Sequence, residues 1–322
     1  FSPRCVESTK PSLYIESTAI EADGQTLASI SDYAPKESHS FDAGISYTDV
    51  DGIVTFRGNN FRDTAAYGNT QIKDGKIKDL WTAKTGSLTY GDATWSGSGW
   101  TGQPLMEKWS KEVKKAMNMY DWAKEKDDLV EVIYACMDGY VYFLDLETGE
   151  ATRDPLYLGF TFKGAGALDP RGYPILYVGA GYDSNEGTAR VFVVNLLDCS
   201  VMYTFGNNDP FSLRGNLSYF DSSALVDAKT DTLIYHGENG ILYLIKLNTS
   251  YDPEAGTLSI APDNIVKWHY YGTRTSIASY WLGMEDSAAI YDGYIFMSDN
   301  GGNLMCLDLN TLQLVWAQDI LD

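Results

Sequence analysis

The sequence predicts an all-β protein: a β-propeller of four-stranded antiparallel blades, with one helical insertion. Two observations carry this prediction, a repeat and the turn dipeptides between short strand-like runs. Each of four units closes on an apolar-polar-apolar triplet, and the central residues of these triplets are 50, 51 and 62 residues apart, at Asp145, Asn195, Lys246 and Asp308. A period near 50 with four short strands per unit is typical of a propeller blade. A solenoid of βα units would instead need helical periodicity in every repeat.

The strand-like runs are rich in Val, Ile, Tyr and Phe, which favours β-structure. Asp-Gly and Asn-Gly dipeptides punctuate them at residues 138–139, 239–240 and 292–293. These dipeptides tolerate positive φ angles and suit tight hairpins. Each unit should end with an outer strand, and three are expected at residues 200–205, 265–269 and 313–317. A Trp in such a strand can fill the wedge between adjacent blades.

The domain prediction has two parts. Residues 1–50 form an N-terminal extension with a hairpin over residues 13–30, around Asp23 and Gly24, and otherwise resemble a polar approach segment. The propeller occupies residues 51–322. Its units cover approximately residues 101–160, 161–206, 219–270 and 283–318.

The segment 78–86, which contains Trp81, resembles an outer strand without a preceding unit. Such a strand would need inner strands from the far end of the chain. Propellers close with roughly four to eight blades. We therefore expect an open arc of about four blades that belongs to a seven- or eight-bladed ring, with exposed edge strands prone to self-association.

One stretch breaks the β pattern. Residues 107–127 place Trp109, Val113, Met117 and Tyr120 at helical spacing, with Lys and Glu on the other faces. This predicts a helical insertion between the first two strands of the first unit, packed on the rim of the blade. A lid or a partner-binding element is the alternative.

The composition argues against two classes of partner. The chain has 24 Lys and Arg against 44 Asp and Glu, a formal net charge of −20. Phosphate groups would repel this charge, so neither nucleic acid nor an anionic membrane surface is expected. The 322 residues contain no apolar run of the length that a membrane-spanning helix needs. Hydrophobic residues make up 44% of the chain, enough for a sizeable core.

Several motifs resemble those of one family. Residues 56–63, 67–68 and 80–86 are similar to the first motif of the pyrroloquinoline-quinone-like (quinoprotein-type) repeat propellers, and residues 142–150 and 304–311 are similar to their blade motifs. The resemblance covers residues 50 to 318 and implies the propeller fold. It implies no single activity, because the family includes quinone-dependent dehydrogenases, a bacterial outer-membrane assembly scaffold and many surface propellers. It also implies an extracellular or cell-surface location, which includes lipid anchoring through a leader.

The residues do not favour a quinone enzyme. The resemblance implies that such an enzyme stacks its cofactor between a Trp and a disulfide of neighbouring cysteines, with calcium held by Glu, Asn and Asp. Here none of Cys5, Cys136, Cys199 and Cys306 is adjacent to another, and the second and third units lack a complete Asp-x-x-Thr-Gly ending. We therefore expect neither pyrroloquinoline quinone nor Ca²⁺ as a cofactor, no metal site and no catalytic residues.

Isolated polar residues offer no stronger chemistry. The chain has three histidines, and two of them, His236 and His269, fall on predicted strands, where a structural role is expected. The oxygen-rich turn at residues 183–187 lacks the spacing of a calcium loop and is interpreted as a solvated hairpin tip.

Propellers usually bind ligands at the mouth of their inner strands. Aligning the units on Ser223 and Ser287 makes Thr101, Gly164, Asp221 and Glu285 equivalent, and other polar or aromatic residues lie next to them. The candidate ligand-binding residues are Trp95, Trp100, Thr101, Gln103, Lys163, Asp221, Glu285 and Asp286. An acidic mouth with an aromatic rim suits a cation, a sugar or a peptide. The alternative is that these are ordinary rim residues.

These observations predict a non-catalytic binding scaffold. Its partner would be a protein, a peptide or a glycan. A quinone-dependent oxidoreductase is the first alternative. The 23 Tyr and 8 Trp suggest a second, a carbohydrate-binding or carbohydrate-processing propeller.

Overall fold

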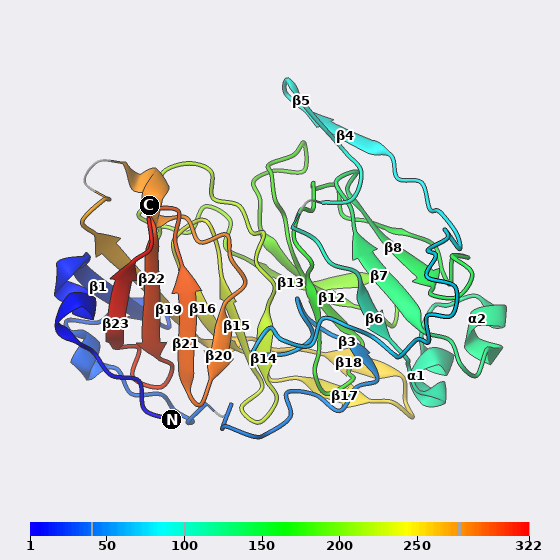
Figure 1. Cartoon of the computed structure of the whole chain (residues 1–322), viewed down its shortest axis with the longest axis horizontal. Coiled ribbons are helices and arrows are strands. Elements are labelled where there is room, and N and C mark those ends of the chain that lie inside the picture. Colours follow the sequence, from blue (N-terminus) through cyan, green and yellow to red (C-terminus); the bar gives the residue numbers. More distant parts are fainter. Residues whose placement is uncertain (40, 100, 276–277, 322) are drawn as a thin grey trace.

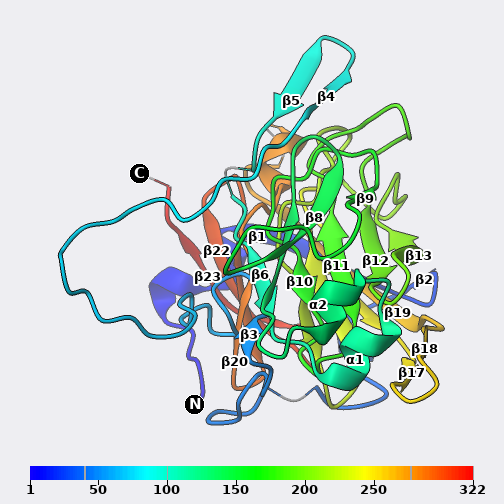
Figure 2. The ribbon, with the colours of Figure 1, turned by 90° about the vertical axis from the view of Figure 1, so that its right-hand side faces the viewer.

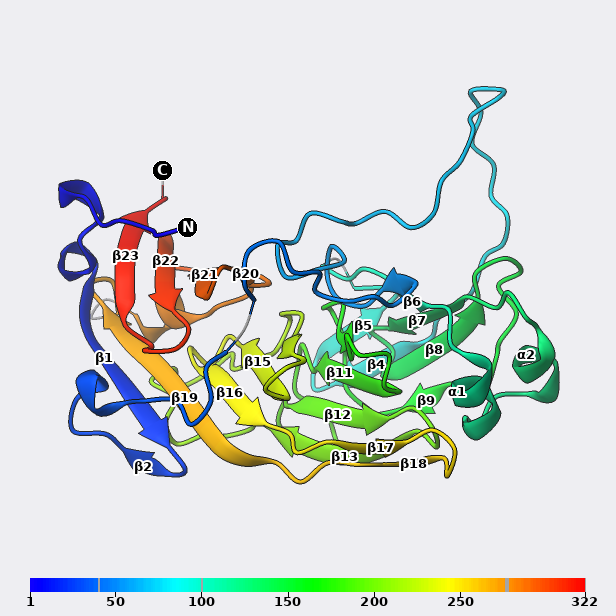
Figure 3. The same ribbon diagram turned by 90° about the horizontal axis from the view of Figure 1, so that it is seen from below.

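The structure is a computed structural model that describes residues 1–39, 41–99, 101–275 and 278–321. Four antiparallel sheets follow one another in chain order as blades, which confirms the predicted fold class. Figure 3 shows the succession, from the first blade at the right to the fourth at the left.

Each blade is a meander of four strands. Blade one contains β6 (Leu105–Glu107), β7 (Glu131–Ala135), β8 (Tyr140–Asp145) and β9 (Leu156–Tyr157), and β3 (Gly52–Ile53) pairs with β6. Blade two contains β10 (Ala167–Leu168), β11 (Ile175–Gly179), β12 (Val191–Asn195) and β13 (Ser200–Phe205). Blade three contains β14 (Leu225–Asp227), β15 (Thr232–His236), β16 (Leu242–Lys246) and β19 (Asp263–Gly272). Blade four contains β20 (Ala289–Tyr291), β21 (Tyr294–Ser298), β22 (Asn303–Asp308) and β23 (Leu314–Asp319). The three outer strands expected from the sequence are therefore β13, part of β19 and β23.

Two short hairpins project from the blades. They are β4 (Ser87–Tyr90) with β5 (Ala93–Ser96), and β17 (Ser250–Asp252) with β18 (Thr257–Ser259). Figure 1 shows the β4–β5 hairpin rising above the ends of the strands. We call this end of the blades the upper face.

The N-terminal strand enlarges blade three. β1 (Ile15–Ala22) turns at Asp23 and Gly24 into β2 (Gln25–Thr26), and it also pairs along its length with β19. Ile20 of β1 is buried, and its side chain packs in the same apolar cluster as Trp268. The first 27 residues thus contribute two strands to a six-stranded sheet.

The helical insertion is broken where a continuous helix was expected. The structure has α1 (Lys111–Ala116) and α2 (Asp121–Glu125), which lie together at the lower edge of blade one (Figure 2). Between them, the N–H of Asn118 donates to the carbonyl of Leu197 at 2.8 Å and the N–H of Tyr120 donates to that of Thr152 at 2.8 Å. These bonds to the blades replace helical ones. Tyr120 is accordingly exposed, whereas the other three residues of the predicted stripe, Trp109, Val113 and Met117, are buried as expected.

The remaining helical elements are single 3₁₀ turns. They are η1 (Glu7–Thr9), η2 (Pro11–Leu13), η3 (Ile30–Asp32) and η4 (Ser279–Leu282). No helix in the described ranges has the length and hydrophobicity that crossing a bilayer requires.

The predicted outer strand at residues 78–86 is wrong. These residues form no strand. Instead, the indole N–H of Trp81 donates to the carbonyl of Leu146 at 2.9 Å, and its ring covers Gly149, where a Cβ would collide with it. Gly149 also has a φ of 72°, which glycine adopts without strain. Trp81 therefore packs across the turn that ends β8.

The core lies between consecutive blades. One apolar cluster joins blades one, two and three, and a second joins blades three and four. On β15, Leu233 and Tyr235 belong to the first cluster and Ile234 to the second. Strands with both faces buried need no polar alternation, which explains the continuous apolar runs in the sequence. Trp268 on the outer strand β19 is fully buried in the second cluster, as a wedge-filling residue should be.

A crossing segment, residues 52–63, runs past the inner strands of all four blades. Thr55 forms a β-bridge with Ala167 of blade two, and its hydroxyl donates to Ala224 ahead of β14. Asn60 exchanges hydrogen bonds with Ile290 of blade four. Together with β3 on blade one, these contacts tie the inner edges of the blades together.

Arg62 is the central side chain of the crossing segment. Its buried guanidinium donates to the carbonyls of Ser223 and Ala288, both at 2.9 Å, and to the Thr55 hydroxyl at 2.7 Å. It therefore links the residues just ahead of the inner strands β14 and β20, which we call the lead residues of blades three and four. Burial lowers the pKa of Arg62 to about 10, so it stays charged at neutral pH.

Candidate binding site on the upper face

The residues that lead into the inner strands meet on the upper face. The hydroxyl of Thr101 donates to the carbonyl of Lys163 at 2.8 Å. Gly164 lies against the backbone of Asp221 so closely that a Cβ would collide with it. The carboxylates of Asp221 and Glu285 are also close neighbours. The four positions aligned from the sequence thus form a row across consecutive blades.

Three carboxylates gather at the centre of this row. Asp221, Glu238 and Glu285 each present an oxygen, and these oxygens lie within 4.8 Å of one another. We call this group the carboxylate cluster. Asp221 and Glu238 are buried and Glu285 is exposed, so the cluster opens to solvent on the side of Glu285.

Two buried bases border the carboxylate cluster. Lys163 Nζ lies 2.8 Å from Asp221 Oδ2, and Arg214 Nη1 lies 2.9 Å from Glu238 Oε2. The side-chain amide of Asn300 donates to Glu285 at 2.8 Å. With three carboxylates ionised and both bases charged, the group has a formal charge of −1.

Some polar atoms in this group have unused hydrogen-bonding capacity. Asp221 Oδ1 is buried and accepts no hydrogen bond from the described residues. Nε and Nη2 of Arg214 are also buried and have no acceptor within the same ranges. Buried polar atoms without partners are rare in folded proteins. These atoms are therefore available to hydrogen-bond a bound molecule.

The environment raises the pKa of both buried carboxyls. Burial raises the pKa of Asp221 to about 6, although Lys163 partly offsets this, and nearby Glu285 raises it further. Burial, together with Asp221 and Glu285, raises the pKa of Glu238 to about 7. The carboxylate cluster is therefore partly protonated near neutral pH, mainly at Glu238, and a bound cation would displace that proton.

Aromatic rings flank the group. Trp95 on β5 and Tyr219 lie over Lys163, whose Nζ is 5.9 and 5.4 Å from their ring centroids. Tyr182 joins the two, with centroids 5.1 Å from Trp95 and 5.0 Å from Tyr219. Tyr90 at the start of the β4–β5 hairpin turn lies 6.4 Å from Tyr182. The β4–β5 hairpin thus extends the upper face with an aromatic row.

The other nominated residues have different surroundings. Gln103 accepts from the N–H of Arg57 at 3.0 Å and so binds the crossing segment. Asp286 pairs with His236 at 2.6 Å and accepts from the N–H of Ser298. Trp100 lies outside the described residues. Of the ligand-binding residues predicted from the sequence, the structure therefore brings five together on the upper face: Trp95, Thr101, Lys163, Asp221 and Glu285.

Sequence reasoning missed Glu238 and Arg214. Glu238 lies in the β15–β16 hairpin, whereas the alignment considered only residues ahead of the inner strands. An acidic residue next to the Asn239–Gly240 turn was the available signal. Arg214 lies in the long connection before β14 and carries no pattern that points to the site.

His269 and the polar turn have local partners. His269 stacks on Phe211 with a centroid distance of 4.0 Å and bonds its carbonyl through Nδ1 at 2.7 Å. The turn at residues 183–187 closes on itself through a bridge between Ser184 and Gly187, and Asp183 accepts from the N–H of Ala189.

The described residues do not fit a stacked quinone. Cys5, Cys136, Cys199 and Cys306 are all free thiols, so none forms the disulfide that the family resemblance implies for that cofactor.

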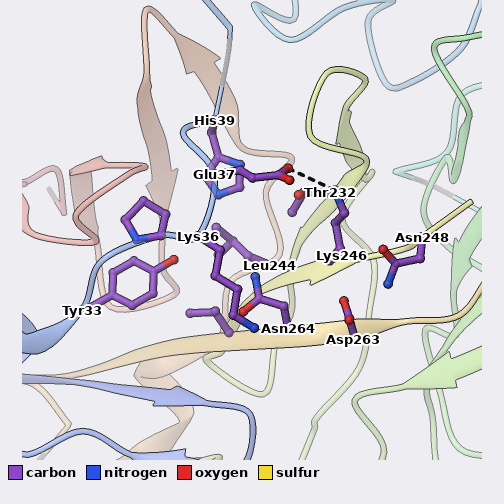
Figure 4. Close-up of a pocket in the computed structure, with 12 residues that line it drawn as sticks. Tyr33, Lys36, Glu37, His39, Thr232, Leu244, Lys246, Asn248, Asp263 and Asn264 are labelled. Carbon is purple, nitrogen blue, oxygen red and sulfur yellow. Dashed lines mark hydrogen bonds and ion pairs between the residues drawn. The ribbon is translucent and has the colours of Figure 1, made fainter.

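A separate cavity of about 210 Å³ lies between residues 33–39 and the outer part of blade three (Figure 4). Lys246 pairs there with Glu37 at 3.1 Å, and Lys36 pairs with Asp23 at 3.5 Å. Since each of these lysines has an acidic partner, the cavity shows no charge excess that would define a ligand.

Comparisons with known proteins give only distant similarities. No known protein-family description matches the chain, and no curated protein matches it. Among solved structures, BamB from Moraxella catarrhalis is 13% identical, with a TM-score of 0.35, over 60% of this chain and 47% of that protein. A europium-containing methanol dehydrogenase is 12% identical, with a TM-score of 0.41, over 86% of this chain and 59% of that protein. Sqt1 from Saccharomyces cerevisiae is 12% identical, with a TM-score of 0.40, over 60% of this chain and 46% of that protein. The chain thus spans about half the length of these proteins.

Proposed function

We propose that the protein is a non-catalytic binding scaffold that takes a positively charged peptide or protein segment on its upper face. The carboxylate cluster with its aromatic flank is the observation that supports this proposal. The proposal includes an extracellular or cell-surface location, which stays a prediction from the family resemblance.

Two properties of the molecule favour a cationic partner. The formal net charge of −20 attracts cations over the distance of a Debye length and speeds their encounter. At the site itself, Tyr182, Tyr219 and Trp95 offer flat, partly exposed rings that suit aliphatic stems and cation–π contacts. The net charge raises the rate of association, and the aromatic rings provide contact area in the bound state.

Fluorescence anisotropy with labelled decapeptides tests the proposal. One peptide alternates Lys with Gly, and the matched peptide alternates Glu with Gly. We expect the Lys peptide to bind, with an affinity that falls as salt rises, and the Glu peptide not to bind. Replacing Glu285→Gln and Tyr182→Ala together should weaken binding at least tenfold.

The control pair is Glu254→Gln with Tyr120→Ala, which removes one acid and one exposed ring away from the upper face (Figure 2). Equal loss in both pairs would show that only net charge matters and would contradict an upper-face site.

A dye-reduction assay with pyrroloquinoline quinone and Ca²⁺ tests the non-catalytic part of the proposal, and robust turnover there would overturn it. Binding on a glycan array without peptide binding would favour the carbohydrate alternative instead.

A further inference from the structure

We propose that the carboxylate cluster of Asp221, Glu238 and Glu285 is a subsite for one primary ammonium group, such as the end of a lysine side chain. This inference rests on the proposed function and names the chemical group that the upper face recognises.

Charge balance selects a monovalent ligand. The three carboxylates and the buried bases Lys163 and Arg214 carry a formal charge of −1 when all are ionised. One ammonium group neutralises this group. A divalent cation would leave it with a positive charge in a largely buried place, next to two bases that already repel it.

The spacing of the acceptors also fits an ammonium group. A primary ammonium has three N–H donors at tetrahedral angles. With N···O distances of about 2.8 Å, its three acceptors lie about 4.6 Å apart. The oxygens of the carboxylate cluster lie within 4.8 Å of one another, a limit that includes this spacing.

A buried acceptor without a donor is the second observation. Asp221 is 4% exposed, and its Oδ1 accepts no hydrogen bond within the described part of the chain, while Oδ2 is engaged by Lys163. A carboxylate oxygen left in this state costs free energy that an incoming N–H would recover. Solvent-exposed Glu285 marks the side from which the ligand can enter.

Binding should release protons. Since Glu238, and to a smaller extent Asp221, is protonated near neutral pH in the free protein, an ammonium group that needs both ionised displaces those protons. Affinity should therefore rise as pH increases from 5.5 to 8.

Isothermal titration calorimetry with a small probe tests the subsite. The probe is Nα-acetyl-lysine amide, and Nα-acetyl-norleucine amide is the matched compound without the ammonium group. We expect the lysine probe to bind and the norleucine probe not to bind. Titrations in buffers of different ionisation enthalpy should show net proton release at pH 6.5. The exposed Glu285→Gln change should weaken binding at least tenfold, and Glu254→Gln should leave it unchanged.

Asp221→Asn is the stronger variant, but it leaves buried Lys163 without its carboxylate and can unfold the protein. The exposed Glu285→Gln variant keeps the test decisive in that case. Equal binding of both probes would overturn the proposal, and so would no binding of the lysine probe. Tight binding of CaCl₂ that excludes the lysine probe would also overturn it in favour of a metal site.

The two proposals can fail separately. If the Lys-Gly decapeptide binds the upper face while the lysine probe does not, the scaffold function survives and the ammonium subsite is wrong. If the lysine probe binds while the decapeptide does not, the subsite stands and the scaffold function is wrong.

Discussion

Glu238 shows what burial does to one side chain on the upper face. It is 4% exposed and lies close to Asp221 and Glu285, and the basic side chains of Lys163 and Arg214 offset the resulting rise in pKa only in part. The folded protein therefore holds the Glu238 proton more tightly than the unfolded chain does. This contribution to stability is fully present below about pH 4.5 and is lost as pH rises through about 7.

Glu238→Gln tests this linkage. The amide cannot ionise, so the variant should lose the part of the pH dependence that belongs to Glu238. We expect the free energy of unfolding of the native protein to fall by roughly 2–3 kcal/mol more than that of the variant between pH 5 and pH 8. Urea unfolding at the two pH values measures this difference. Buried Glu107, whose pKa is also raised, contributes equally to both proteins and cancels in the comparison. Parallel pH profiles would contradict the assigned shift.

The crossing segment is the element on which the arrangement of the blades depends most. Its backbone and side chains meet the inner edge of every blade, and Arg62 joins the lead residues of blades three and four. Those lead residues carry Asp221 and Glu285 into the site. The crossing segment therefore positions the carboxylate cluster without contributing a carboxylate to it.

Arg62→Met should destabilise the fold. The change keeps an unbranched side chain but leaves the carbonyls of Ser223 and Ala288 without their buried donor, at a cost of about 2–4 kcal/mol. Urea unfolding measures the loss. Arg57→Met in the same segment is the control, because Arg57 is exposed. A similar stability for both variants would show that Arg62 does not tie the blades together.

At the level of elements, local patterns could be predicted and long-range contacts could not. The strands of each blade are signalled by short β-branched and aromatic runs with Asp-Gly or Asn-Gly turns, which are local features. The pairing of β1 with β19 joins residues some 250 positions apart, and nothing near Ile20 announces it. The strand prediction around Trp81 was wrong because the indole donates to the Leu146 carbonyl and packs on Gly149. These are tertiary contacts that the local sequence does not signal.

The site was predictable to a similar degree. Internal repetition identified Asp221 and Glu285, because equivalent residues of successive blades meet at one end of a propeller. Glu238 and Arg214 reach the same place from a hairpin tip and a long connection, where the repeat gives no alignment. Their pairing at 2.9 Å depends on three-dimensional packing alone.

For the whole molecule, charge and shape favour the same face for binding. The formal net charge of −20 draws cations to the protein as a whole, and the carboxylate cluster, the aromatic row and the β4–β5 hairpin form the proposed recognition site at one end of the blades. The cavity under residues 33–39 lies elsewhere and has its lysines paired with acids. A cationic partner should therefore choose the upper face over that cavity.

Hydrogen exchange with and without the Lys-Gly decapeptide tests this central claim most directly. We predict slower exchange in the upper connections at residues 206–222 and 237–241, with no change in the lower turns at residues 228–231 and 292–293. The Glu-Gly decapeptide should produce no protection. Protection confined to residues 33–39 or to the lower turns, or no protection at all at a saturating peptide concentration, would contradict a binding site on the upper face.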